Sequence, residues 1–282
     1  MSSVQKMILS TILITILFIG CGKNQPMQKS NKINSVVTLI TYKDFVESIG
    51  GAEVVVTSLI PPGANPHAFE PVPDHIKQMS DADVYFKVGG NFHFEEELMS
   101  GVSVSREKLT IIDCSTGIKI INNNPHVWLG PDQVKIILKN IYSALVRFKP
   151  DKEEYFNTNL ERFLTKLDSL ETQFKNKFNA ADRKTFVVYH EAWGYYANHF
   201  NLVELAVEKE GKEPNVYHMK NIVEEAKKNK IKVIFSEPQT NRQSALAVAH
   251  EIGANIDFIN PHPAKYLNNF IEVSNKLLES FK

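Results

Sequence analysis

The sequence of 282 residues has no excess of charge of either sign and very little cysteine. Its 32 lysines and arginines balance its 32 aspartates and glutamates. Without a basic excess, the chain lacks the attraction for polyanions that nucleic-acid binding requires, so we expect no nucleic-acid partner. Two cysteines are too few for a disulfide scaffold or a cysteine-rich metal site. There is no internal repeat, and 43% apolar with 23% charged residues is a normal globular composition.

The N-terminal segment has the pattern of a signal peptide. Residues 7–20 are mostly isoleucine and leucine, and Lys6 is the only charge before position 23. A basic residue, a short apolar run and a small residue before a cleavage point predict a signal peptide over 1–20. The alternative is a membrane-spanning anchor, but spanning takes about 20 apolar residues. We therefore expect the protein to be exported.

Cys21 directly follows this apolar run and the small residue Gly20. A cysteine in this position resembles the lipobox of bacterial lipoproteins, in which the cysteine is diacylated and becomes the mature N-terminus. Phe18 occupies the place where that motif usually has leucine. The polar residues after Cys21 have no periodicity, so we predict a flexible tether over 21–34. The resemblance implies that lipid on Cys21 holds the protein to the cell membrane or within the periplasm.

From position 35 onward, short β-rich runs alternate with helical patterns. This alternation predicts an α/β fold in which helices cover parallel sheets. The predicted strands are 36–40, 54–59, 84–88, 109–113, 186–189, 203–207, 233–235 and 256–259, and the predicted helices are 43–49, 73–80, 131–148, 221–229 and 243–252.

The segment 150–180 interrupts the alternation. Its apolar residues recur at intervals of three and four from Phe156 to Phe178, and charged residues fill the other faces. The spacing predicts one helix of about 25 residues or more, about 40 Å long. A coiled coil is the alternative, but phenylalanine in the seam favours a helix that packs on two lobes. We therefore expect an N-terminal lobe over 35–149 and a C-terminal lobe over 181–282.

Three of the nine histidines lie where predicted strands or loops end. His67 lies in a proline-rich loop after a strand, His126 precedes a predicted helix, and His190 ends a strand. In open parallel sheets, ligands bind outside the carboxyl ends of the strands, where such loops gather. Imidazole suits zinc, which prefers four ligands, so the three histidines are candidate metal ligands. Taken singly, each is more typical of a surface or capping residue.

The remaining histidines have less informative surroundings. His75, His218 and His250 are expected at solvated helix or turn positions, and His199 follows the His190 motif without a role of its own. His93 precedes three glutamates and is expected at a solvated helix start, with an accessory metal-gathering role as the alternative.

Several segments resemble the metal-binding solute-binding lipoproteins of bacterial ABC importers for zinc and manganese, specifically the zinc-type members. In that family the ligand loops read like Pro-Gly-x-x-Pro-His-x-x-Glu-Pro, Asp-Pro-His-x-Trp-Leu-Asp-Pro and His-x-Ala-Phe/Trp-Gly-Tyr-Phe. Here Asn124 and Gly130 replace the two aspartates of the second loop. The matching residues are Pro62, Gly63, Pro66, His67, Glu70, Pro71, Pro125, His126, Trp128, Leu129, Pro131, His190, Ala192, Trp193, Gly194 and Tyr195, and segments 208–214 and 235–239 are also similar.

The resemblance, which extends from about Val36 to the C-terminal helix, has consequences for fold and function. It implies two (β/α) lobes joined by one rigid helix that limits opening, with the metal in the cleft between the lobes. It implies an extracytoplasmic protein, expected to be a monomer, that captures Zn²⁺ through His67, His126 and His190 and delivers it to a permease subunit.

The fourth ligand is where this sequence departs from the family, which usually has Leu-Asp-Pro after the last strand. The corresponding residues here are Ile259, Asn260 and Pro261. Because a neutral asparagine is a weak zinc ligand, we rank water or Asn260 first, His262 second and Asp257 third. Three imidazoles with a weak oxygen donor favour zinc, whereas manganese sites contain more carboxylate.

Zinc capture has alternatives. A manganese- or iron-binding homologue and a metal-dependent adhesin are alternatives within the family. Three histidines with an open fourth position are also typical of catalytic zinc. However, the sequence has neither His-Glu-x-x-His nor Gly-x-Ser-x-Gly, and Glu191 would face away from His190 on a strand. Cys114 ends an apolar strand and is expected to be buried, so we expect a binding protein and not an enzyme.

Overall fold

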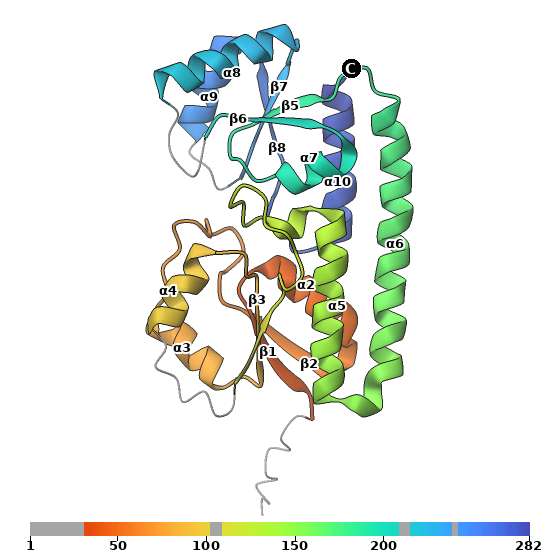
Figure 1. Ribbon diagram of the computed structural model, residues 1–282. Coiled ribbons are helices and arrows are strands. Elements are labelled where there is room, and N and C mark those ends of the chain that lie inside the picture. The colour runs from red at the N-terminus through yellow and green to blue at the C-terminus, as the bar shows by residue number, and fades with distance from the viewer. Residues whose placement is uncertain (1–30, 102–108, 209–214, 239–241) are drawn as a thin grey trace, which may run out of the picture. The chain divides into compact units, whose positions relative to one another are not determined.

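The computed structural model describes residues 31–101, 109–208, 215–238 and 242–282 (Figure 1). The predicted signal peptide, Cys21 and most of the predicted tether lie outside these residues. The described chain forms two α/β lobes, each built on a four-stranded parallel sheet, with a long helix running beside both (Figure 1). The predicted fold class is therefore confirmed.

The N-terminal lobe has the strand order β2-β1-β3-β4. Its strands are β1 (Ile33–Val37), β2 (Val54–Ser58), β3 (Val84–Lys87) and β4 (Thr110–Asp113), and its first helices are α2 (Ile40–Gly50), α3 (Pro73–Ser80) and α4 (His93–Gly101).

The first strand differs from its prediction. It begins at Ile33, within the segment that we predicted to be tether, and it ends before Ile40, which begins α2. The shift has a physical reason, because the side chain of Ile33 is buried in the core and the backbone N–H of Asn34 donates to Asp83.

The C-terminal lobe repeats the arrangement with the strand order β6-β5-β7-β8. In each lobe the second and third strands of this order, β1 with β3 and β5 with β7, lie where the connections change direction, which is the usual ligand position in open α/β sheets. The strands are β5 (Thr185–Val188), β6 (Val203–Ala206), β7 (Val233–Ser236) and β8 (Asn255–Phe258), and the helices are α7 (Gly194–Phe200), α8 (Val216–Lys228) and α9 (Arg242–Ile252).

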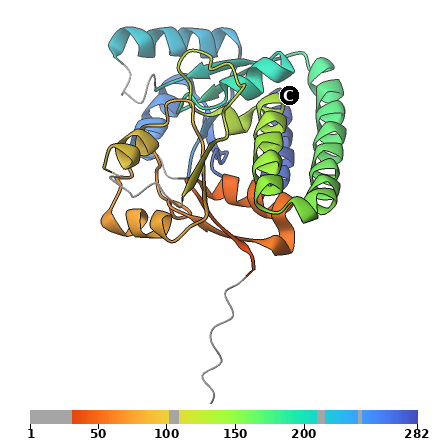
Figure 2. The ribbon, with the colours of Figure 1, turned by 60° about the horizontal axis from the view of Figure 1, so that its bottom comes forward.

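Three further helices pack together along one side of both lobes (Figures 1 and 2). They are α5 (Pro131–Phe148), α6 (Glu153–Asn179) and α10 (Tyr266–Ser280). The helix α6 has 27 residues, and the apolar positions from Phe156 to Phe178 that predicted it are mostly buried. None of the helices in the described segments is both long and apolar enough to span a membrane.

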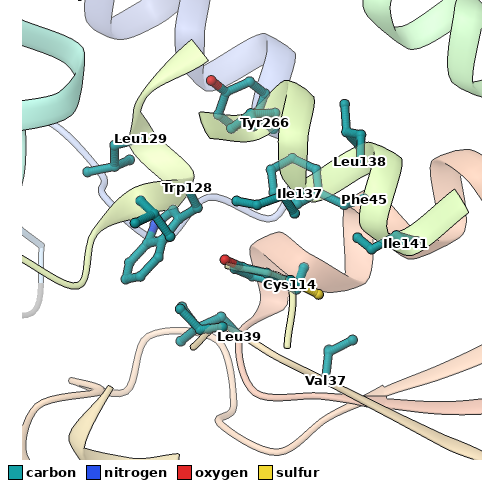
Figure 3. Packing of buried hydrophobic residues seen from close by; sticks show 14 of the residues in the cluster. Val37, Leu39, Phe45, Cys114, Trp128, Leu129, Ile137, Leu138, Ile141 and Tyr266 are labelled. Atoms are coloured by element: carbon teal, nitrogen blue, oxygen red, sulfur yellow. The ribbon is translucent and has the colours of Figure 1, made fainter. Parts of the chain in front are cut away.

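A continuous hydrophobic core crosses the junction between the lobes (Figure 3). Phe45 of the N-terminal lobe packs on Tyr266 of α10 with 5.2 Å between the ring centroids, and Trp128 and Cys114 belong to the same buried cluster. Burial raises the pKa of the Cys114 thiol well above its ordinary value, so this cysteine is unreactive. The two lobes therefore share one core. The described residues also include three short 3₁₀ turns, Gly51–Glu53, Val127–Leu129 and Pro150–Lys152.

Candidate metal site

The three histidines singled out in the sequence meet at the carboxyl ends of the sheets. The Nε2 atom of His67 lies 3.1 Å from Nε2 of His126, and Nε2 of His190 lies 3.3 Å from the same atom. One ligand atom of each residue lies within 4.8 Å of the other two. We call His67, His126 and His190 the histidine site. It joins the loop after β2, the turn before α5 and the loop after β5.

The spacing of these nitrogens fits a tetrahedral metal. Zinc–nitrogen bonds of about 2.0–2.1 Å place neighbouring ligands about 3.3–3.4 Å apart. The two Nε2 distances of 3.1 and 3.3 Å are close to this value.

Hydrogen bonds at the opposite ring nitrogens decide which way the lone pairs point. Nδ1 of His126 lies 2.7 Å from Oδ1 of Asn124, and Nδ1 of His190 lies 2.9 Å from Oε2 of Glu208. Since both partners are acceptors, each Nδ1 carries a proton. In the neutral rings the two Nε2 lone pairs then face each other at 3.3 Å, an arrangement that a shared cation or proton stabilises.

The His126 turn is held by both lobes. Oδ1 of Asn124 also accepts from the backbone N–H of His126 at 2.9 Å. The Tyr195 hydroxyl, from α7 of the C-terminal lobe, donates to the Asn124 carbonyl and accepts from the Ile121 N–H, both at 3.0 Å. Thus Asn124, where the resembling family has aspartate, keeps an orienting hydrogen bond to His126 without contributing a charge.

Two glutamates that were not predicted as individual site residues lie beside His190. Glu208 orients the ring, and Glu237 is buried with its Oε1 atom lacking a hydrogen-bond partner among the described residues. Both follow strands of the second sheet. The rule that ligands bind at the carboxyl ends of parallel strands, which pointed to the histidines, could therefore have identified these glutamates as well. Burial raises the pKa of Glu237 to about 7, although the charge of His190 opposes this effect.

The pKa values of His67 and His126 are shifted in the opposite direction from that of His190. Burial and then the positive charge of His190 lower the pKa of His67 to about 4 and that of His126 well below its ordinary value. Burial acts the same way on His190, but the Glu208 hydrogen bond and the charges of Glu237 and Glu208 outweigh it and raise the pKa. At neutral pH His67 and His126 are therefore neutral. At His190, in contrast, a proton competes with a metal ion for the ring nitrogen.

The candidates for the fourth position have different surroundings. Oδ1 of Asp257 accepts from Lys276 at 3.1 Å and from the backbone of Phe258 at 2.7 Å. Oδ1 of Asn260 accepts from the backbone N–H of His262 at 2.9 Å. His262 is 9% exposed, and neither ring nitrogen has a hydrogen-bond partner in the described part of the chain.

The structure nevertheless connects His262 with the histidine site. Its ring lies 5.6 Å from that of Trp128, which in turn lies 5.2 Å from the ring of His126. Burial, followed by the charges of His67 and His190, lowers the pKa of His262 to about 3. His262 is therefore a neutral imidazole next to the site, although it does not belong to the group within 4.8 Å.

The surroundings of two other histidines differ from expectation. His75, expected to be solvated, is 5% exposed, because its Nδ1 accepts from the backbone N–H of Val72 at 3.0 Å and its ring packs on Phe94. His199 belongs to a separate group with Asp132 and Glu171. In contrast, His93 is exposed at the start of α4, 3.2 Å from Glu97, and does not reach the histidine site.

Comparison with known proteins identifies the family of this chain. Residues 36–282 match the family model of zinc-uptake complex component A, periplasmic. The high-affinity zinc uptake system protein ZnuA of Bacillus subtilis is 28% identical over 87% of this chain and 84% of that protein. The manganese ABC transporter substrate-binding lipoprotein PsaA of Streptococcus mitis is 26% identical over 85% of this chain and 83% of that protein.

A solved structure gives the same result. A crystal structure of ZnuA superposes with a TM-score of 0.84 at 29% identity, covering 89% of this chain and 100% of that one. With a family model that matches nearly all of the described residues, the chain belongs to the family of the periplasmic component A of zinc-uptake complexes.

Proposed function

We propose that this protein is the extracytoplasmic zinc-binding component of an ABC-type metal importer, and that it binds Zn²⁺ through His67, His126 and His190 and delivers it to the permease subunit. The observation that carries the proposal is the opposition of the His126 and His190 Nε2 atoms at 3.3 Å, with both Nδ1 atoms engaged by acceptors. A cation between them relieves the repulsion of the lone pairs.

The donor set favours zinc over manganese. Three neutral imidazole nitrogens suit a borderline metal, whereas Mn²⁺ prefers carboxylate and water oxygens. Relatives of both kinds exist, since the Bacillus subtilis protein is a zinc uptake protein and the Streptococcus mitis protein is a manganese lipoprotein by their names. For this chain the choice follows from the nitrogen donors.

A water molecule completes the tetrahedral shell in this proposal. Asn260 is a poor candidate because its Oδ1 already accepts the backbone N–H of His262. His262 lies beyond the three ligands but has two ring nitrogens without partners, so it can accept a hydrogen bond from the metal-bound water.

Attachment to the membrane is the second part of the proposal. Acylated Cys21 would keep the protein outside the cytoplasmic membrane and close to the permease, with the residues before Ile33 as the tether. Two acyl chains are enough for stable anchoring, whereas one gives only reversible attachment. Mass spectrometry of the membrane fraction tests this part, because it detects the diacyl modification on a peptide that begins at Cys21.

Calorimetric titration tests the metal site. The wild-type protein should bind one Zn²⁺ tightly and bind Mn²⁺ much more weakly. A variant with His67→Ala, His126→Ala and His190→Ala should lose the tight event, whereas a control with His93→Ala and His250→Ala, two exposed histidines, should keep it. Tight zinc binding by the triple variant would refute the assigned ligands. A strain from which the gene for this protein has been deleted should grow poorly when zinc is scarce. If the wild-type protein does not restore its growth, the role in import is refuted.

A further inference from the structure

A second group of metal-ligating side chains lies between three helices, apart from the histidine site. Asp132 is in the first turn of α5, Glu171 is on α6, and His199 is in the last turn of α7. One ligand atom of each lies within 4.8 Å of the others. We call these three residues the helix-junction cluster. It joins the N-terminal lobe, the long helix and the C-terminal lobe.

The hydrogen bonds of His199 leave one ring nitrogen available. Its Nδ1 lies 2.8 Å from Oδ2 of Asp132, an acceptor, so Nδ1 carries a proton. Its Nε2 is buried without a hydrogen-bond partner and lies 3.6 Å from Oε2 of Glu171. This distance is too long for a hydrogen bond but close to the separation of about 3.3–3.5 Å between two ligands of one zinc ion.

Glu171 provides the independent indication of a ligand. The residue is only 9% exposed, and its Oε1 atom is buried without a partner among the described residues. Its Oε2 atom accepts from Lys135 at 3.0 Å. The carboxylate thus has one buried oxygen without a partner, and its other oxygen lies next to a buried imidazole nitrogen that also has none.

The charges around the cluster also match a divalent cation. The acidic groups in contact are Asp132, Asp168 and Glu171, and the only ammonium in contact with them among the described residues is that of Lys135. The three carboxylates therefore outnumber the one ammonium group, and negative charge is in excess at the cluster. Lys135 also contacts Asp168 at 2.7 Å, so it can leave Glu171 and remain paired.

We propose that Glu171 and Nε2 of His199 bind a second divalent cation of the zinc type, with Asp132 orienting His199 through its Nδ1–H. The arrangement is a carboxylate–histidine–metal relay, and water supplies the remaining ligands. The site is weaker than the histidine site because it has only two protein ligands and because Lys135 competes for Glu171. It uses none of the residues of the histidine site.

Occupation of this site has a mechanical consequence. The helix α5 begins directly after the turn that carries His126, and α7 begins shortly after His190. A cation held between α6 and α7, with Asp132 linking α5, fastens both ligand-bearing segments to the long helix. Excess zinc should therefore raise the melting temperature even when the histidine site is absent.

Zinc titration of the His67→Ala, His126→Ala, His190→Ala variant isolates the second site. We expect one weak zinc-binding event and a zinc-dependent rise in melting temperature, both abolished by Glu171→Gln and by His199→Gln. Lys135→Gln should tighten the weak event several-fold because it removes the competing ammonium. His93→Asn is the matched control, since His93 also pairs with a carboxylate, that of Glu97, but on an exposed face.

Two results would overturn the proposal. One is that the triple variant binds no zinc at millimolar concentration; the other is that its binding survives both Glu171→Gln and His199→Gln. Circular dichroism of the two variants shows whether they fold, and only variants that fold like the wild-type protein are compared. Neither result concerns the histidine site. If the ligands assigned to that site were wrong, the triple variant would instead retain tight zinc binding.

Discussion

The indole N–H of Trp128, in the N-terminal lobe, donates a hydrogen bond of 2.7 Å to the carbonyl of Pro261, in the C-terminal lobe. Trp128 is completely buried, and its ring packs against both His126 and His262. One side chain therefore joins the lobes, supports a proposed zinc ligand and contacts the imidazole proposed to hold the metal-bound water.

Replacing Trp128 with phenylalanine should destabilise the protein and loosen the zinc site. The Pro261 carbonyl loses its donor, which costs about 1–3 kcal/mol when the group stays buried. The smaller ring also leaves a gap beside His126. Urea unfolding should show the lower stability, and stopped-flow measurements should show faster zinc release. Trp193→Phe removes the other tryptophan and serves as the control, and equal effects of both changes would contradict a special role for the Trp128 bond.

Acidification should weaken zinc binding first through His190. Because the pKa of His190 is raised above its ordinary value of 6.5, this residue gains a proton before His67, whose pKa is about 4. Zinc must displace that proton, so affinity should fall about tenfold per pH unit below the pKa of His190. Titrations in buffers of different ionisation enthalpy should detect the released proton.

Glu208→Gln should move this pH dependence. The carboxylate raises the pKa of His190, so its removal lowers that pKa, and the acid weakening of zinc binding begins at lower pH. At alkaline pH the variant should bind zinc about 10–100-fold more weakly, because the ring loses a charged orienting partner. Glu225→Gln, at an exposed pair with Lys228, is the control. An unchanged pH profile in the Glu208 variant would contradict the assigned role.

His262→Ala should reduce zinc affinity by less than His67→Ala does. In the proposed site His262 accepts a hydrogen bond from the metal-bound water, whereas His67 contributes a metal–nitrogen bond. Cobalt substitution provides the readout, since the visible spectrum of Co²⁺ responds to a change of ligand. An equal loss of affinity in the two variants, with a changed cobalt spectrum for His262→Ala, would show that His262 binds the metal directly.

Glu95→Ala should destabilise the N-terminal lobe without removing a zinc ligand. The buried Glu95 carboxyl group accepts from the backbone N–H groups of Val88 at 2.6 Å and Gly89 at 2.9 Å, and from the Thr38 hydroxyl. Each buried donor left without a partner costs about 1–3 kcal/mol, so we expect a loss of about 3 kcal/mol or more. Thermal unfolding measures it, and Glu96→Ala, at the exposed neighbouring position, should have little effect.

Local patterns were sufficient to predict much of this molecule. The bounds of α3 and α5 agree with the predictions over 73–80 and 131–148, and all eight strands lie at or next to their predicted positions. The places of His67, His126 and His190 after strands or before a helix made them candidate ligands, and the structure brings their ring nitrogens together. Period-two and period-3.6 patterns, with proline at helix starts, are properties of neighbouring residues and can be read along the chain.

The details of the site depended on contacts between distant residues. Glu208 meets His190 because β6 pairs with β5, and Trp128 meets Pro261 across 133 positions of the chain. The burial of His75, the unpartnered ring of His262 and the junction of Asp132, Glu171 and His199 arise in the same way. Such neighbours are set by how strands pair and helices pack, and no short segment carries that information, so the environment that tunes each histidine emerged only in three dimensions.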